Sequence, residues 1–166
     1  HQYRLLGLER LPKGPALLVG NHSSALFPSD SFLLGATLFK ERGEEGFPLS
    51  LAHHMILKIP PLRWMLPTLG FITGSHENAA RAFKLGHKVL VYPGGDVEAL
   101  RSFKNRNQVD FAGHAGFLKL AIRENVPIVP IVTAGAHETL YILHSLPKLA
   151  KFLKTNKWMG MHAWPL

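Results

Sequence analysis

Short apolar runs alternate with segments of helical periodicity along most of the chain, and this alternation limits the fold more than any other feature. Four runs have the length, apolar content and flanking turn residues of buried strands: 16–20, 48–54, 87–93 and 126–135. Three segments between them carry apolar side chains at helical spacing: 30–40, 75–86 and 113–125. Strands that alternate with helices predict an α/β fold, here a single domain whose mixed, mostly parallel sheet is flanked by helices.

Helix boundary signals are clearest around 75–86. Ser75 occupies the N-cap position, Glu77 falls in the first turn, and Gly86 follows the last turn. The segment 55–71 differs, because prolines interrupt its apolar sequence and proline breaks helices. We therefore expect two or three short turns there.

Two interpretations of 55–71 are open. Its apolar content fits a segment of the hydrophobic core. Its basic residues, Lys58 and Arg63, and its Trp64 fit an interfacial surface or acyl-chain tunnel at the level of lipid headgroups.

The length of 166 residues predicts one domain, 1–166. The chain begins at His1 without a Met, so we expect a fragment of a longer protein, with any membrane anchor lying upstream. It contains no cysteine, which excludes disulfides, thiolate metal ligands and cysteine nucleophiles.

A net charge of +8 favours an anionic partner, such as a phospholipid surface, a nucleic acid or a phosphate-bearing substrate. Nucleic acid is disfavoured, because the basic residues are dispersed and no recognised nucleic-acid-binding motif accompanies them. No uncharged apolar run reaches the roughly 18 residues that a spanning helix needs. A protein of this sequence that acts at a membrane would lie on its surface or rely on an anchor elsewhere; a merely basic soluble protein is the alternative.

Three of the expected strands end in residues suited to chemistry. In open α/β sheets, ligand sites gather at the carboxyl ends of the strands. The residues that follow these strands are Asn21-His22, Tyr92-Pro93-Gly94-Gly95-Asp96 and Thr133-Ala134-Gly135. We expect a site built from these three strand ends.

His22 is the best candidate for a general base at this site. Histidine titrates near neutral pH, and a carboxylate at its other ring nitrogen would fix the tautomer and stabilise the imidazolium. Asp30 would supply that carboxylate if the loop between them folds back. The pattern is short and arises often by chance, so from spacing alone an ordinary turn residue at the end of a strand is the favoured explanation of His22.

Gly94-Gly95 is suited to a tight turn that presents backbone N–H groups to an oxyanion or phosphate, although a plain turn is the alternative. Neither a P-loop nor a serine-hydrolase elbow occurs. The histidines lack the spacing of metal sites, so we expect no metal.

Four segments, taken in order, resemble the phospholipid/glycerol acyltransferase superfamily. They are GLERLPKGPALLVGNHSS, LGFITGSHENAARAFKLG, HKVLVYPGG and GFLKLAIRENVPIVPI. The resemblance runs from about residue 4 to residue 142. It implies transfer of a fatty acyl group from a thioester, acyl-CoA or acyl-ACP, to a hydroxyl, without a bound cofactor.

The resemblance also implies roles for individual residues. His22 would be the catalytic base and Asp30 its partner. The residues implied for substrate binding are Asn21, Ser23, Tyr92, Pro93, Gly94, Gly95, Glu98 and Arg101. The expected partners are a membrane lipid surface at its cytoplasmic face, the thioester donor and a lipid alcohol acceptor.

Departures from the family pattern bear on the acceptor. Seven residues separate His22 from Asp30 where four are usual, and Gly74-Ser75 stand where an arginine normally clamps a phosphate. The sequence Pro-Gly-Gly followed by Glu98 looks closer to the diacylglycerol acyltransferase type-2-like branch, which uses neutral acceptors. We therefore expect mono- or diacylglycerol as acceptor. The alternatives are a lysophospholipid acyltransferase, with Arg101 or other basic residues replacing the clamp, and a non-catalytic lipid-binding domain.

Overall fold

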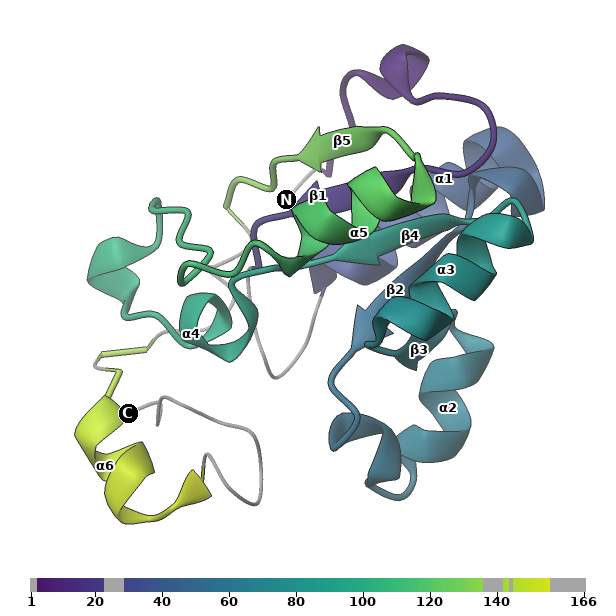
Figure 1. Ribbon diagram of the computed structural model, residues 1–166. Coiled ribbons are helices and arrows are strands. Elements are labelled where there is room, and N and C mark those ends of the chain that lie inside the picture. The colour runs from purple at the N-terminus through teal and green to yellow at the C-terminus, as the bar shows by residue number, and fades with distance from the viewer. Residues whose placement is uncertain (1–2, 23–28, 136–141, 144, 156–166) are drawn as a thin grey trace. The chain divides into compact units, whose positions relative to one another are not determined.

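The computed structural model describes residues 3–22, 29–135, 142–143 and 145–155 (Figure 1). Five strands form one sheet in the order β3-β2-β4-β1-β5. The strands are β1 (Leu17–Gly20), β2 (Pro48–Ala52), β3 (Phe71–Thr73), β4 (Lys88–Val91) and β5 (Ile128–Ile131). The strands run parallel, with β1 and β2 on either side of β4 and β3 beyond β2. The expected α/β fold with a mostly parallel sheet is confirmed.

Helices connect the strands. The α-helices are α1 (Ser29–Gly46), α2 (Leu62–Thr68), α3 (His76–Lys84), α4 (Gly95–Ala99), α5 (Gly116–Glu124) and α6 (Pro147–Phe152). Three short 3₁₀ turns accompany them: η1 (Leu8–Arg10), η2 (Ile56–Lys58) and η3 (Phe103–Asn105). Among the described residues, no helix combines the length and the apolar character needed to cross a bilayer.

The strand order explains why helices cover both faces of the sheet. The connection from β1 through α1 runs one way across the sheet, whereas those through α3 and α5 run the other way. Parallel connections are right-handed almost without exception. Accordingly, α1 lies behind the strands in Figure 1, while α3 and α5 lie side by side in front.

The direction of the connections reverses between the neighbouring strands β1 and β4. Ligands in open α/β sheets bind outside the carboxyl ends of the strands at such a reversal. The residues that leave these two ends, Asn21-His22 and Tyr92-Pro93, are the ones whose chemistry the sequence singled out.

Internal contacts divide the chain into two compact units. The first comprises His1–Val19, Ser31–Val91 and Gly116–Ile131, and therefore holds nearly all of the sheet. The second comprises Gly20–Asp30, Tyr92–Ala115 and Val132–Leu166, so it holds the segments that follow β1, β4 and β5.

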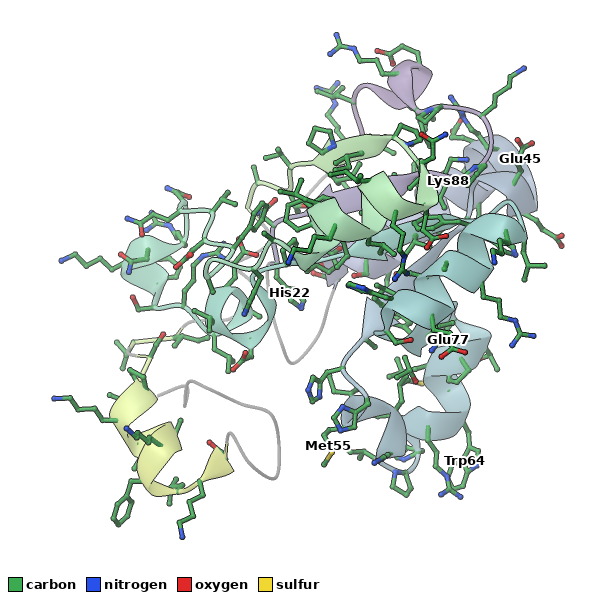
Figure 2. The ribbon with its side chains drawn as sticks, viewed as in Figure 1. His22, Glu45, Met55, Trp64, Glu77 and Lys88 are labelled. Carbon is green, nitrogen blue, oxygen red and sulfur yellow. The ribbon has the colours of Figure 1, made fainter. Side chains whose placement is uncertain are left out.

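The core of the first unit consists of apolar side chains from the central strands and the helices that cover them. Fully buried examples are Ala16, Leu17, Leu18, Ala79, Val89 and Leu90. Lys88, at the start of β4, is also buried, and only 1% of it is exposed. Its Nζ donates hydrogen bonds to the carbonyl oxygens of Gly14 (2.9 Å) and Glu45 (3.3 Å) (Figure 2). Burial lowers the Lys88 pKa, because the charged ammonium is poorly solvated there.

Several element boundaries match the sequence patterns and others differ. Ser75 caps α3 by accepting the Asn78 N–H at 3.1 Å, and Gly86 adopts φ +85° just beyond the helix, as predicted. The helix predicted at 30–40 extends to Gly46, interrupted by a non-helical Gly43. In place of turns alone, 55–71 contains η2, α2 and the start of β3, a strand that the sequence analysis missed.

Candidate active site

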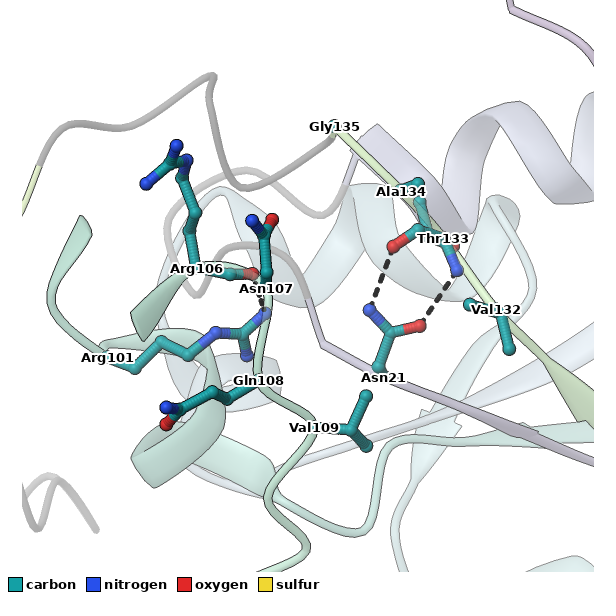
Figure 3. Close-up of a pocket in the computed structure, with 10 residues that line it drawn as sticks. All are labelled: Asn21, Arg101, Arg106, Asn107, Gln108, Val109, Val132, Thr133, Ala134 and Gly135. Atoms are coloured by element: carbon teal, nitrogen blue, oxygen red, sulfur yellow. Dashed lines mark hydrogen bonds between the residues drawn. The ribbon is translucent and has the colours of Figure 1, made fainter. Parts of the chain in front are cut away.

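The candidate site lies within the second unit, where Asn21 directly follows β1. Its side-chain amide continues the pairing between β1 and β5. Asn21 Nδ2 donates to the Thr133 carbonyl oxygen at 2.9 Å, and the Thr133 N–H donates to Asn21 Oδ1 at 2.8 Å (Figure 3). The Asn21 side chain thus fixes the main chain immediately before His22.

His22 and Asp30 face each other although they lie eight positions apart. Asp30 falls in the first turn of α1, where the helix dipole favours a carboxylate. Its Oδ2 lies 3.9 Å from His22 Nδ1, at the outer limit of an ion pair and longer than a hydrogen bond. The Asp30 side chain is only 1% exposed and that of His22 is 18% exposed. The structure therefore brings together the two residues that the sequence singled out as base and partner.

Tyr92, the first residue after β4, covers one face of the His22 ring. The two ring centroids are 4.5 Å apart and the planes are inclined by 17°, which is a stacked arrangement. Gly20 makes room for it, since a Cβ at that position would lie 2.7 Å from the Tyr92 ring. The imidazole is thus held between an aromatic face and a buried carboxylate.

Glu98 and Arg101 hold the main chain of His22. Glu98 Oε2 accepts the His22 N–H at 2.7 Å, and Arg101 Nη1 donates to the His22 carbonyl oxygen at 3.1 Å. The two side chains also pair with each other, with Arg101 Nη1 and Glu98 Oε1 at 3.6 Å. Glu98 is 0% exposed and Arg101 is 8% exposed. Both residues were expected to bind substrate, but their charged groups are buried against the protein's own backbone.

Burial sets the ionisation of this pair. The Glu98 pKa is raised because desolvation outweighs the stabilising N–H donors of His22 and Asp110 and the charge of Arg101. The Arg101 pKa is lowered by the same cause, partly offset by the Glu98 and Asp110 carboxylates. The two groups therefore stabilise each other's charged forms against a common cost of burial.

The two glycines before Glu98 serve different purposes. A Cβ at Gly94 would lie 2.4 Å from the Asp110 carbonyl oxygen and 2.6 Å from Glu98 Oε2, so close packing requires glycine there. Gly95 adopts φ +52°, and its N–H donates to the Tyr92 carbonyl oxygen at 3.1 Å. The Gly95 N–H that the sequence offered for an oxyanion is thus engaged in closing the turn. Pro93 is buried, and its carbonyl oxygen lies 2.9 Å from His114 Nδ1.

A cavity of about 230 Å³ lies beside Asn21 within the same unit (Figure 3). Its wall combines guanidinium and amide groups with apolar side chains. The residues that line it are Asn21, Arg101, Arg106, Asn107, Gln108, Val109, Val132, Thr133, Ala134 and Gly135. Arg101 is committed there, since it also donates to the Glu98 and Arg106 carbonyl oxygens at 2.8 and 3.1 Å.

The remaining site expectations are quickly placed. Ser23 lies outside the described residues. In the part of the chain that the structure describes, no group of three or more His, Asp or Glu side chains is positioned to hold a metal ion. Sequence reasoning missed the roles of Asn21 and Glu98 in holding the main chain; the Gly94–Glu98 spacing, one helical turn, is the local signal that points to the second.

Comparison with known proteins identifies the family of this chain. The sequence matches the Acyltransferase family over residues 2–134. The chain belongs to this family. The match confirms the resemblance to the phospholipid/glycerol acyltransferase superfamily.

Some curated relatives are named as enzymes that synthesise storage lipids. The chain is similar to proteins named "DGAT1/2-independent enzyme synthesizing storage lipids" from Mus musculus (30% identical over 138 residues, 83% of this chain and 40% of the relative) and Gallus gallus (32% over 166 residues, 99% and 48%). It is also similar to an uncharacterized protein of Mycobacterium tuberculosis (28% over 146 residues, 87% and 40%). The chain thus spans less than half the length of these relatives. No solved structure matches it significantly.

Proposed function

We propose that this chain is an O-acyltransferase that moves a fatty acyl group from an acyl thioester, acyl-CoA or acyl-ACP, to a lipid hydroxyl. The observation that carries the proposal is the His22 imidazole between the Asp30 carboxylate and the Tyr92 ring, in a member of the Acyltransferase family. A base beside a buried carboxylate that stabilises its imidazolium is suited to deprotonate an alcohol.

The reaction follows from the orientation of the imidazole. With Nδ1 turned toward Asp30, Nε2 is the nitrogen that accepts the proton of the acceptor hydroxyl. The hydroxyl oxygen then attacks the thioester carbonyl carbon, a tetrahedral intermediate forms, and its collapse breaks the carbon–sulfur bond. The imidazolium returns the proton to the departing thiolate, so that ester and free thiol are the products. Asp30 stabilises the imidazolium between the two proton transfers.

A neutral acceptor, mono- or diacylglycerol, fits best. Gly74-Ser75 leave no guanidinium at the position where the family pattern places a phosphate clamp. Arg101 is a poor replacement, because its guanidinium already donates to the carbonyl oxygens of His22, Glu98 and Arg106. Relatives named for the synthesis of storage lipids support the same choice.

The test is a donor-by-acceptor activity screen. Acyl-CoA and acyl-ACP are each offered with monoacylglycerol, diacylglycerol, lysophosphatidate and glycerol 3-phosphate, and ester formation is measured. We expect transfer to a neutral glyceride, lost by about 10²–10⁴-fold in His22→Ala and retained in the control His87→Ala, whose histidine is half-buried in the first unit. Preference for lysophosphatidate would favour the phospholipid alternative, and retained transfer in His22→Ala would refute the base assignment.

The surface formed by η2 and α2 supports a membrane as the place of action. Large apolar side chains are exposed there, including Ile59 (48%), Trp64 (60%) and Met65 (46%). The Arg63 guanidinium lies 4.4 Å from the Trp64 ring centroid, and Lys58 is exposed nearby in sequence. Trp64 projects outward from this part of the chain in Figure 2. Apolar and basic groups on one surface fit a bilayer that contains anionic headgroups.

Vesicle flotation tests the membrane proposal. We expect the chain to float with vesicles of phosphatidylcholine and phosphatidylglycerol, and less with phosphatidylcholine alone. Trp64→Ala with Arg63→Glu should reduce flotation several-fold through loss of apolar burial and charge attraction. Leu85→Ser, which removes an apolar side chain that is 67% exposed on another element, is the matched control. Equal loss in both variants would refute this surface as the docking site.

A further inference from the structure

Glu98 and Arg101 form hydrogen bonds with the two main-chain polar groups of His22. The N–H of His22 is held by Glu98 Oε2 at 2.7 Å, and its carbonyl oxygen by Arg101 Nη1 at 3.1 Å. Both side chains come from one short segment, α4 and the second residue after it. The peptide groups on either side of the His22 Cα are thus fixed from a single piece of the protein.

The charged groups of these two residues bond to the protein's own main chain, although Arg101 also lines the cavity beside Asn21. The Glu98 carboxylate is 0% exposed, and its second oxygen accepts the Asp110 N–H at 3.3 Å. The Arg101 side chain is 9% exposed, and its guanidinium donates to main-chain carbonyls.

We propose that Glu98 and Arg101 are positioning residues, which fix the main chain of His22 so that its imidazole is presented to Asp30 and Tyr92. This inference rests on the proposed function, because it assigns His22 the role of base. A side chain can be placed no more accurately than the Cα that bears it, and a misplacement of about 1 Å can cost a hundredfold in rate. His22 needs such support because it is the second residue after β1 and lies outside the strand.

A carboxylate is the group that this arrangement requires. Glu98 accepts the N–H of His22 on one oxygen and the N–H of Asp110 on the other. Glutamine has one acceptor oxygen, so in Glu98→Gln one of these N–H groups must face the NH₂ of the amide. Gly94 supports the same fit, since a Cβ there would lie 2.6 Å from Glu98 Oε2.

The experiment compares Glu98→Gln and Arg101→Lys with the control Lys88→Met. Lys88 is also a buried cation that donates to two carbonyls, but it lies in the first unit, and its acceptors belong to Gly14 and Glu45. In the transferase assay we expect kcat to fall about 10- to 100-fold in the two test variants, with KM for the thioester nearly unchanged. Lys88→Met should keep its kcat per folded molecule.

A spectroscopic readout makes the test independent of activity. The charged groups that face His22 are Asp30 from α1, Glu98 from α4 and Arg101 beyond it, with Tyr92 as the neighbouring phenol. Glu98→Gln removes a negative charge and leaves the guanidinium, so the His22 imidazole should titrate at lower pH. In NMR spectra of the full chain, the His22 amide proton should also move upfield, while Lys88→Met leaves both signals in place.

The outcomes separate this inference from the proposed function. An unchanged His22 amide signal and unchanged kcat in Glu98→Gln would overturn the positioning role. Equal loss of kcat in Lys88→Met would do the same, because it would reveal a general effect on stability. If the unmutated chain transfers no acyl group, the proposed function fails and the NMR titration alone decides whether the pair holds His22. If Glu98→Gln does not fold, Arg101→Lys provides the same comparison.

Discussion

Lys88 and Arg101, at the two ends of one stretch of chain, are both buried cations that donate to main-chain carbonyls, yet they serve different ends. Lys88 joins the loop before β1 to the end of α1, since its partners are the carbonyls of Gly14 and Glu45. Arg101 joins the candidate base to the segment around Glu98. The first cation stabilises the scaffold, and the second holds a residue of the site.

The chemistry of each cation suits its place. An ammonium buried without a carboxylate at hydrogen-bond distance has a lowered pKa and can lose its proton. A guanidinium stays charged and offers several donors in a plane, so it can reach three carbonyls and still pair with Glu98. Replacing each in turn measures how much of its effect is stability and how much is positioning.

The largest effect is expected for Arg101→Met. It removes the donors of three carbonyls and leaves the buried Glu98 carboxylate without its cation, which should destabilise the fold by about 3–5 kcal/mol. Urea unfolding followed by circular dichroism measures the loss. A change below 1 kcal/mol would contradict the view of Arg101 as a central link between His22 and Glu98.

Gly94→Ala comes next. The new Cβ would lie 2.4 Å from both the Asp110 carbonyl oxygen and Glu98 Cβ, so we expect about 1–3 kcal/mol of destabilisation and lower transferase activity. Gly95→Ala is the matched control. No atom lies within 4 Å of its Cβ, and only its φ of +52° opposes the substitution, so the cost should be about 1 kcal/mol. Equal costs would mean that Glu98 moves aside freely.

For Lys88→Met we expect a smaller loss, about 1 kcal/mol. The carbonyls of Gly14 and Glu45 lose a donor, but the cost of burying an ammonium disappears as well. Unfolding in urea and the transferase assay are measured on the same sample. If activity fell by more than the loss of folded protein, Lys88 would, like Arg101, be a positioning residue.

The smallest effect is a difference in pH dependence. The Glu98 pKa is raised in the folded state, so its contribution to stability is full below the unfolded value of 4.5 and declines as pH rises through the folded pKa. The lowered Lys88 pKa acts in the opposite way: below 10.5, its stability cost diminishes as pH rises from the folded pKa toward that value.

The pH dependence is measured as the free energy of unfolding of the wild type minus that of each variant. For Glu98→Gln this difference should fall with rising pH above 4.5, and for Lys88→Met it should rise as pH approaches 10.5. The reverse slope for either variant would contradict the assigned environment of that group.

Local signals in the sequence predicted the fold well. The ends of α3 follow from a capping serine and a trailing glycine, which act within one helical turn. The strand β3 was missed because three residues carry no periodicity, and its identity comes from pairing with β2. The helix predicted at 30–40 continues to Gly46, because the helical turns resume after the non-helical Gly43.

The site was predicted in part. The rule that strand ends converge anticipated that His22 and Tyr92 share a site, whereas the pairing of His22 with Asp30 was expected from a loop that folds back and from the family resemblance. The hydrogen bond between Glu98 and His22 joins residues 76 positions apart. It also depends on the absence of a Cβ at Gly94, and a single sequence reveals neither fact. Glu98 and Arg101, which were expected to bind substrate, bond to the main chain of His22 in the structure.

The side chain of Asn21 is, in effect, a substitute peptide group. With one donor and one acceptor at the spacing of a backbone amide, it satisfies both polar groups that Thr133 would otherwise offer to a neighbouring strand. The strand β1 can therefore end at Gly20 while both main-chain polar groups of Thr133 keep a hydrogen-bond partner. The N–H and the carbonyl of His22 therefore take no part in strand pairing. This leaves them available to the Glu98 carboxylate and the Arg101 guanidinium.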